Sequence, residues 1–185
     1  MKIYHKIIKE SLKIVILTSI LGSIGGIAAA SIHEKLILFL PLLIILPAIN
    51  DMVGDFGIIM SSRFTTMLFT GKIDKNWSDS IEFAKLYKNI VIIAIIMAVY
   101  AAIASNIIGH FYGFDLDLFV MLKITLISII SVSLLVILML FTSVIGGLMI
   151  FKKGEDPDNF LIPVNTALGD FGSLVIFTIL IIILF

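Results

Sequence analysis

Long apolar runs, separated by short polar segments, dominate the pattern of the chain. A helix that crosses a bilayer needs about 20 mainly apolar residues, and five runs reach that length. They cover roughly 11–32, 36–70, 86–111, 117–149 and 159–185. We therefore expect an all-α, polytopic membrane protein in which residues 1–185 form a single domain of five transmembrane helices.

The second and fourth runs are longer than one bilayer crossing, so their helices should tilt, kink or project beyond the membrane. Pro41 and Pro47 lie in the second run. Because a proline inside a helix removes one backbone hydrogen bond, we expect a kink there. Before the third run, the Asp-x-x-Glu pattern of Asp79 and Glu82 predicts the start of a helix.

Composition agrees with a membrane protein and excludes several other classes. The 185 residues are 60% hydrophobic and only 14% charged, which soluble domains of this size do not approach. The 13 basic and 13 acidic residues cancel, so no net charge points to nucleic acid or to an acidic substrate. The chain has no Cys, which excludes disulfides, thiolate catalysis and thiolate metal sites.

The basic residues lie on alternate sides of the predicted helices. Lys and Arg gather at the N-terminus, between the second and third runs, and between the fourth and fifth, whereas the opposite side has Lys35 and little else. Short loops rich in Lys and Arg stay in the cytoplasm. We therefore expect the N-terminus in the cytoplasm and the C-terminus outside, with Lys123 snorkelling to the outer interface.

Two copies of Gly-Asp-Phe-Gly, at 54–57 and 169–172, place Asp55 and Asp170 inside apolar runs. An ionised Asp at the centre of a membrane helix costs about 2.5–3.5 kcal/mol on insertion scales, so such residues face a cavity, a partner or an ion path. Each copy follows a proline, and the two predicted helices run in opposite directions. This pattern is typical of an inverted repeat around a midplane transport site, although four residues are too few to prove duplication.

Oxygen-bearing side chains surround both aspartates. Asp51 and Asp55 are four residues apart, as are Thr166 and Asp170, so each pair shares a helix face. An all-oxygen set without Cys or an intramembrane His favours a hard cation, Mg²⁺ or Ca²⁺, over Zn²⁺ or copper. The predicted metal ligands are Asp170, Asp55, Asn165, Thr166, Asp51 and Asn50.

Structural explanations compete with these assignments. A carboxylate beside a packing glycine can be protonated, or paired with Arg63 or with a Lys of a neighbouring helix. Arg63 itself lies toward the positive side, which favours an interfacial anchor over a substrate ligand. Gly22 and Gly26 have the Gly-x-x-x-Gly spacing of closely packed helices.

The stretch from Asp156 to Asp170 reads Asp-Pro-Asp-Asn-Phe-Leu-Ile-Pro-Val-Asn-Thr-Ala-Leu-Gly-Asp. It resembles the fifth helix of the MgtE-type magnesium transporters, in particular of their eukaryotic solute-carrier relatives and archaeal half-length counterparts. The resemblance covers essentially the whole chain. The second run is similar to the family pattern of Pro, Gly-Asn, Arg and Gly through Pro47, Gly54, Asp55, Arg63 and Gly71.

The resemblance implies a five-helix transport domain that pairs with a second copy, with the ion path between helices two and five. Asp170 matches the family's ion-binding acid, and Asn165 and Thr166 lie on the adjoining motif. Asp55 occupies a position where many relatives carry Asn, which leaves its role or the ion preference open. Bacterial members carry large sensor domains before the membrane part, where this chain has about a dozen residues, so we expect no gating of that kind.

The main hypothesis is therefore a homodimer in the cell membrane that transports Mg²⁺ and is not an enzyme. An intramembrane aspartyl protease is an alternative, but its Gly-x-Gly-Asp signature is absent. A membrane subunit that transports nothing is the other alternative. The sequence leaves open channel against coupled carrier, the coupling ion, the direction of transport, and the ranking of Mg²⁺ against Mn²⁺, Co²⁺ and Ca²⁺.

Overall fold

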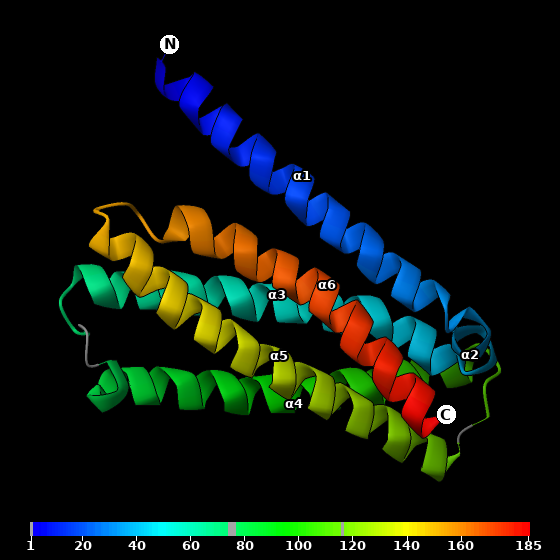
Figure 1. Cartoon of the computed structure of the whole chain (residues 1–185). Coiled ribbons are helices and arrows are strands. Elements are labelled where there is room, and N and C mark those ends of the chain that lie inside the picture. The colour runs from blue at the N-terminus through cyan, green and yellow to red at the C-terminus, as the bar shows by residue number, and fades with distance from the viewer. Residues whose placement is uncertain (1, 74–76, 116) are drawn as a thin grey trace.

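The computed structural model describes residues 2–73, 77–115 and 117–185, without the side chains of 2–11, 13–15 and 78. The described chain is all-α, as predicted. The long helices from Leu40 to Leu184 lie side by side in a bundle, and the N-terminal helix leans on this bundle and diverges from it toward its own N-terminal end (Figure 1). The elements are α1 (Lys2–Ala30), α2 (His33–Leu38), α3 (Leu40–Phe69), the short 3₁₀ turn η1 (Trp77–Asp79), α4 (Ile81–Phe111), α5 (Leu118–Lys152) and α6 (Asp158–Leu184).

The lengths of the helices suit a multi-pass membrane protein. α3, α4, α5 and α6 are each long and apolar enough to cross a bilayer. The described apolar part of α1, Ile16–Ala30, is shorter than a full crossing. The prediction of helices that are long and apolar enough to cross a membrane is thus confirmed for four of the five runs, and a span by α1 stays a prediction.

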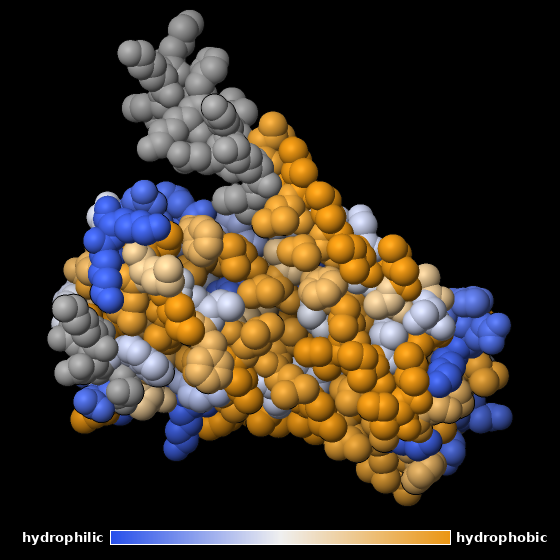
Figure 2. All heavy atoms as spheres, in the orientation of Figure 1, coloured by the Kyte–Doolittle hydropathy of each residue, from blue (hydrophilic) through white to orange (hydrophobic). Residues whose placement is uncertain are grey.

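The surface of the bundle is apolar around its middle. Ile96, Ile103 and Phe141 are large apolar side chains that point outward. Figure 2 shows hydrophobic side chains across the middle of the face in view and hydrophilic ones at its two ends. This distribution fits a lipid belt between two polar interfaces.

The second predicted run contains a break rather than a kink at its first proline. α2 ends at Leu38, and Phe39 leaves the helical conformation with φ −111° and ψ 81°. α3 then begins at Leu40, so Pro41 occupies its first turn, where its missing N–H has no helical acceptor to lose. The second run is therefore interrupted beside Pro41, whereas Pro47 lies inside a continuous helix and a kink there stays a prediction.

A residue beside the predicted start signal caps α4. The helix begins at Ile81, and the side chain of Ser80 accepts a hydrogen bond from the backbone N–H of Phe83 at 3.2 Å. This is an ordinary N-cap, in which a hydroxyl satisfies one of the free N–H groups of the first turn. The Asp-x-x-Glu pattern therefore located the start of α4 to within one residue.

The two Gly-Asp-Phe-Gly copies meet where α3 and α6 cross. A Cβ placed on Gly169 would lie 3.3 Å from the backbone N and 3.4 Å from the Cα of Gly54. One turn away, a Cβ on Gly57 would lie 3.1 Å from the Cβ of Asn165. These pairs run in opposite order along the chain, so α3 and α6 are antiparallel. Glycines thus let two helix backbones approach directly, as in tightly packed membrane helices.

α5 packs against the same crossing from one side. The methyl carbon of Met139 would lie 3.1 Å from a Cβ on Gly57 and 3.0 Å from a Cβ on Gly169. Further along α6, Gly172 packs on Leu135. The core of the bundle therefore has three helices around one contact point, and α4 covers the remaining side of α3 and α5.

Candidate functional site

Asp170 lies half-buried at the crossing and is held by a side chain from α3. The amide nitrogen Nδ2 of Asn50 donates to Oδ1 of Asp170 at 3.0 Å. The hydroxyl of Ser173 donates to Oδ1 of Asn50, and it also lies 3.1 Å from the carbonyl oxygen of Asp170. Ser173 therefore orients the Asn50 amide so that its N–H faces the carboxylate.

No basic side chain in the described part of the chain forms an ion pair with Asp170. The explanation that Arg63 or a Lys of a neighbouring helix neutralises this carboxylate is therefore not supported, and Arg63 is itself exposed. A neutral amide donor stabilises a carboxylate but does not cancel its charge. The geometry leaves an acidic side chain without a basic partner near the middle of two apolar helices, a position where such side chains usually face a cavity, a partner or an ion path.

Asn165 belongs to a second polar cluster, one turn of α6 before Asp170. Its Nδ2 atom lies 2.7 Å from Oγ of Ser61 on α3 and 2.8 Å from Oγ of Ser143 on α5. Its carbonyl oxygen accepts from the hydroxyl of Thr142. Ser61 in turn donates to the carbonyl of Gly57 at 2.7 Å.

The Asn165 side chain is fully buried, and this network satisfies both its donors and its acceptor. It thereby connects α3, α5 and α6 at one level of the bundle. An ion bound at Asn165 would have to displace one of these hydrogen bonds. The predicted ligand role of Asn165 stays a prediction, and the contacts give it a structural role as well.

Thr166 is half-buried and lies on the same face of α6 as Asp170, one turn earlier. The structure thus keeps the predicted pairing of these two side chains on one helix face. Whether the Thr166 hydroxyl contacts an ion stays a prediction.

Asp51 and Asp55 lie on a different side of α3 from Asn50. Both are exposed, and both line a groove of about 490 Å³ between α3 and α4. One residue along a helix corresponds to a rotation of about 100°. Because Asn50 and Gly54 face α6, the residues that follow them, Asp51 and Asp55, point away from α6. The structure confirms that the two aspartates share a face, but no described contact joins either of them to Asp170.

The predicted ligands therefore separate into three groups: Asp170 with Asn50, Asn165 with its hydroxyl partners, and Asp51 with Asp55. Among the described residues, no group of three His, Cys, Asp or Glu side chains lies close enough to hold a metal ion. An ion at this crossing would have few direct carboxylate ligands from one copy of the chain. That arrangement suits an ion that keeps most of its water.

Polar side chains also continue along α3 from the two aspartates. Asp51, Asp55, Ser62 and Thr66 have spacings of four, seven and four residues, which place them on one helix face. We call these four residues the α3 polar stripe. Three of them are exposed and Ser62 is half-buried. A polar stripe on a helix long enough to span a membrane normally faces water or another protein surface.

Sequence reasoning missed the contribution of α5 to the site. Thr142 and Ser143 both bind Asn165. The available signal was two adjacent hydroxyl residues inside a strongly apolar run, where polar side chains usually mark a helix contact.

Comparison with known proteins adds one match. The family model MgtE, described as divalent cation transporter, matches residues 46–180. The matched segment includes every predicted ligand. The family is one of transporters and not of enzymes, as expected for this chain. No curated protein and no solved structure matches the chain.

Proposed function

We propose that this chain, which belongs to the MgtE family of divalent cation transporters, carries Mg²⁺ across the cell membrane along a path lined by α3 and α6. Asp170 is the ion-binding residue of this proposal. The observation that carries it is the half-buried carboxylate at the α3–α6 crossing, held by the neutral amide of Asn50 and without a basic partner in the described chain.

The chemistry of Mg²⁺ suits so sparse a site. Mg²⁺ releases its waters reluctantly and is commonly bound through one or two carboxylates while it stays largely hydrated. The ion's waters donate hydrogen bonds, so carboxylate, hydroxyl and amide oxygens can serve as acceptors around it. Asn50 fixes one oxygen of Asp170, which leaves the other for the ion or its water. Thr166 on the same helix face is a further acceptor in this proposal.

A homodimer would complete the path. Gly172 follows Asp170 by two residues and packs on Leu135, so α5 lies on the opposite side of α6 from Asp170. The side of Asp170 and the α3 polar stripe are not covered by α5. A second copy placed against the side of Asp170 would bring a second Asp170 to the same path.

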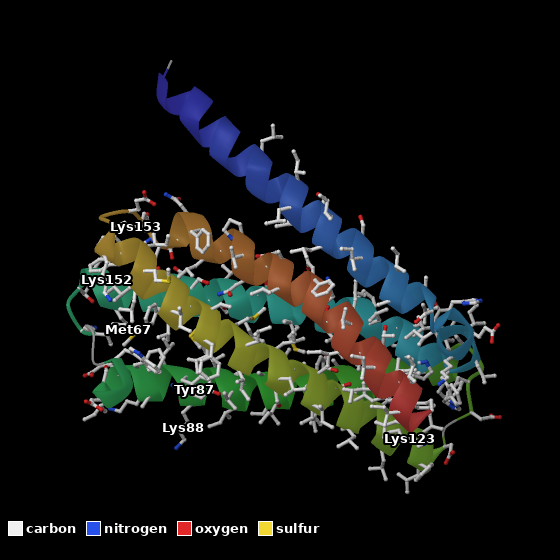
Figure 3. The ribbon with its side chains drawn as sticks, in the orientation of Figure 1. Met67, Tyr87, Lys88, Lys123, Lys152 and Lys153 are labelled. Carbon is white, nitrogen blue, oxygen red and sulfur yellow. The ribbon has the colours of Figure 1, made fainter. Side chains whose placement is uncertain are left out.

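We further propose that α1 crosses the membrane as a fifth span, with the N-terminus in the cytoplasm. Lys152 and Lys153 lie at one end of the bundle, and Lys123 lies at the other (Figure 3). Lys72 follows the end of α3, which lies beside the end of α5, because the ring centroids of Phe69 and Phe151 are 5.2 Å apart. The positive charges at this end support its assignment to the cytoplasm. The Lys123 ammonium donates to the carbonyl oxygen of Leu184 at 2.6 Å, as an interfacial anchor at the outer end would.

Transport through Asp170 is tested by Mg²⁺ uptake into liposomes that contain the purified protein and an internal Mg²⁺ dye. Asp170→Asn preserves the size of the side chain and an acceptor for Asn50, so it removes little beyond the charge. We expect at least a tenfold loss of flux. Glu34→Gln is the matched control, because Glu34 is an exposed acid on α2, away from the crossing.

The outcomes separate the proposals. If Asp170→Asn retains full flux, another residue binds the ion, and Asp55 is the next candidate. If the folded wild type carries no divalent ion in either direction, the non-transporting subunit becomes the better account.

The homodimer is tested by crosslinking between single introduced cysteines. This is possible because the chain has no Cys of its own. Ser62→Cys places one thiol on the α3 polar stripe, whereas Ile96→Cys places one on the outward apolar face of α4. Oxidation in membranes should crosslink two copies through position 62 and not through position 96. Crosslinking at 96 alone would show that the copies meet on a different face.

A further inference from the structure

The groove between α3 and α4, which we call the lateral groove, is separate from the α3–α6 crossing. Its volume of about 490 Å³ lies within the range of small-molecule sites. One wall comes from α3 and the other from α4. The lining residues are Ala48, Asp51, Met52, Asp55, Phe56 and Ile59 on α3 with Ile93, Met97, Tyr100 and Ala101 on α4.

The charge of the lateral groove is concentrated on one wall. Asp51 and Asp55 are its two acids, four residues apart on α3, and both are exposed. Neither forms an ion pair with a basic side chain in the described part of the chain. Every other lining residue is apolar except for the hydroxyl of Tyr100. The groove therefore combines two uncompensated carboxylates with an extended apolar surface on a helix that is long enough to span a membrane.

This combination selects the class of ligand. A lipid acyl chain would fit the apolar walls but would leave both carboxylates without a counter-charge, which is costly at this depth. A hydrated metal ion would satisfy the carboxylates but would gain nothing from Met97 or the aromatic ring of Tyr100. A molecule with one ammonium group and an apolar body satisfies both surfaces, and the face of Tyr100 also attracts cations.

We propose that the lateral groove is a binding site for amphipathic organic cations. The ammonium group lies at Asp51 and Asp55, and the apolar body packs along Met97 and Tyr100 on the facing wall. This site is distinct from the proposed ion site at Asp170, and binding to it requires no transport.

The test compares two probes that differ mainly in charge. Binding of 4-phenylbutylamine and of its neutral analogue 4-phenylbutan-1-ol is measured on the purified full chain in nonionic detergent by equilibrium dialysis. We expect saturable binding of the amine at least tenfold tighter than binding of the alcohol. Asp51→Asn with Asp55→Asn should abolish the difference between the probes, whereas Glu34→Gln should preserve it.

A second variant tests the space instead of the charge. Ala48→Phe fills the groove from the α3 wall and leaves both carboxylates in place, so it should weaken binding of the amine about tenfold. It also tests the proposal if the double Asn variant does not fold.

Three results would overturn the proposal. The first is equal binding of amine and alcohol, which would indicate partition into an apolar surface. The second is amine binding that survives both the double variant and Ala48→Phe. The third is a folded wild type that does not bind the amine; crosslinking of two copies through Tyr100→Cys would then show that a second copy covers the groove. None of these results bears on Mg²⁺ flux through Asp170.

Discussion

Replacing Gly169 by alanine should separate α3 from α6, whereas the same change at Gly54 should not. The two glycines meet at one crossing, but the space around them differs. A Cβ on Gly169 would lie 3.0 Å from the Met139 methyl carbon and 3.3 Å from the backbone N of Gly54. A Cβ on Gly54 would meet nothing within 4 Å. Neither glycine has a positive φ, so alanine fits the backbone conformation of both.

The magnitude follows from two opposing terms. Alanine stabilises a helix by about 1 kcal/mol relative to glycine, and this gain is the same at both positions. Overpacking costs about 1–3 kcal/mol, and it applies at Gly169 alone, because the flexible Met139 can move but the backbone of Gly54 cannot. Gly169→Ala should therefore be less stable than Gly54→Ala by about 1–3 kcal/mol.

The assay is chemical unfolding of both variants and the wild type in mixed micelles. Gly26→Ala serves as a third variant, because a Cβ there also meets nothing within 4 Å, and it reports the helix propensity term alone. The reasoning is refuted if Gly54→Ala loses as much stability as Gly169→Ala. It is also refuted if Gly169→Ala gains stability to the same extent as Gly26→Ala.

Three further predictions concern the polar contacts. Asn50→Ala should reduce Mg²⁺ flux about five- to tenfold without abolishing it, because Asp170 loses one hydrogen bond worth about 1 kcal/mol but keeps its carboxyl group. Flux equal to that of the wild type would contradict this prediction. Asn165→Leu should destabilise the bundle by about 2 kcal/mol or more, measured by unfolding in micelles, because buried hydroxyls on two helices lose their partner; an unchanged free energy of unfolding would remove the structural role. Lys123→Met should cost about 1 kcal/mol, because the carbonyl of Leu184 loses a charged donor while the apolar stem is kept; a more stable variant would show that this hydrogen bond is not an anchor.

The sequence predicted the helices well because the length of an apolar run is a local property. The runs matching α3 to α6 could be read without knowledge of packing. The predicted order of the helices also placed the two Gly-Asp-Phe-Gly copies on helices of opposite direction, and the structure adds that they touch through Gly54 and Gly169. The interruption beside Pro41 could not be told from a kink, because a proline that bends a helix and one that begins it look alike in an unbroken apolar run.

The arrangement of the site was less predictable. Helical spacing shows that Asp51 and Asp55 share a face, but not which neighbouring helix that face meets. In the structure they face α4, whereas Asn50, one residue earlier, faces α6 and Asp170. The partners of Asn165 come from two other helices, α3 and α5, so its network depends on tertiary packing that periodicity does not contain.

The placement of α1 has a consequence for biosynthesis. Its main packing partner is α6, and Gly25 of α1 packs on Leu174. At about 5–20 residues per second, the roughly 150 residues between them take on the order of 7–30 s to translate. During that interval α1 lacks its main packing partner. Its exposed isoleucines, such as Ile24 and Ile27, are compatible with contact between this helix and lipid during that time. The packing of α1 on the nascent bundle is therefore completed only after α6 has been made.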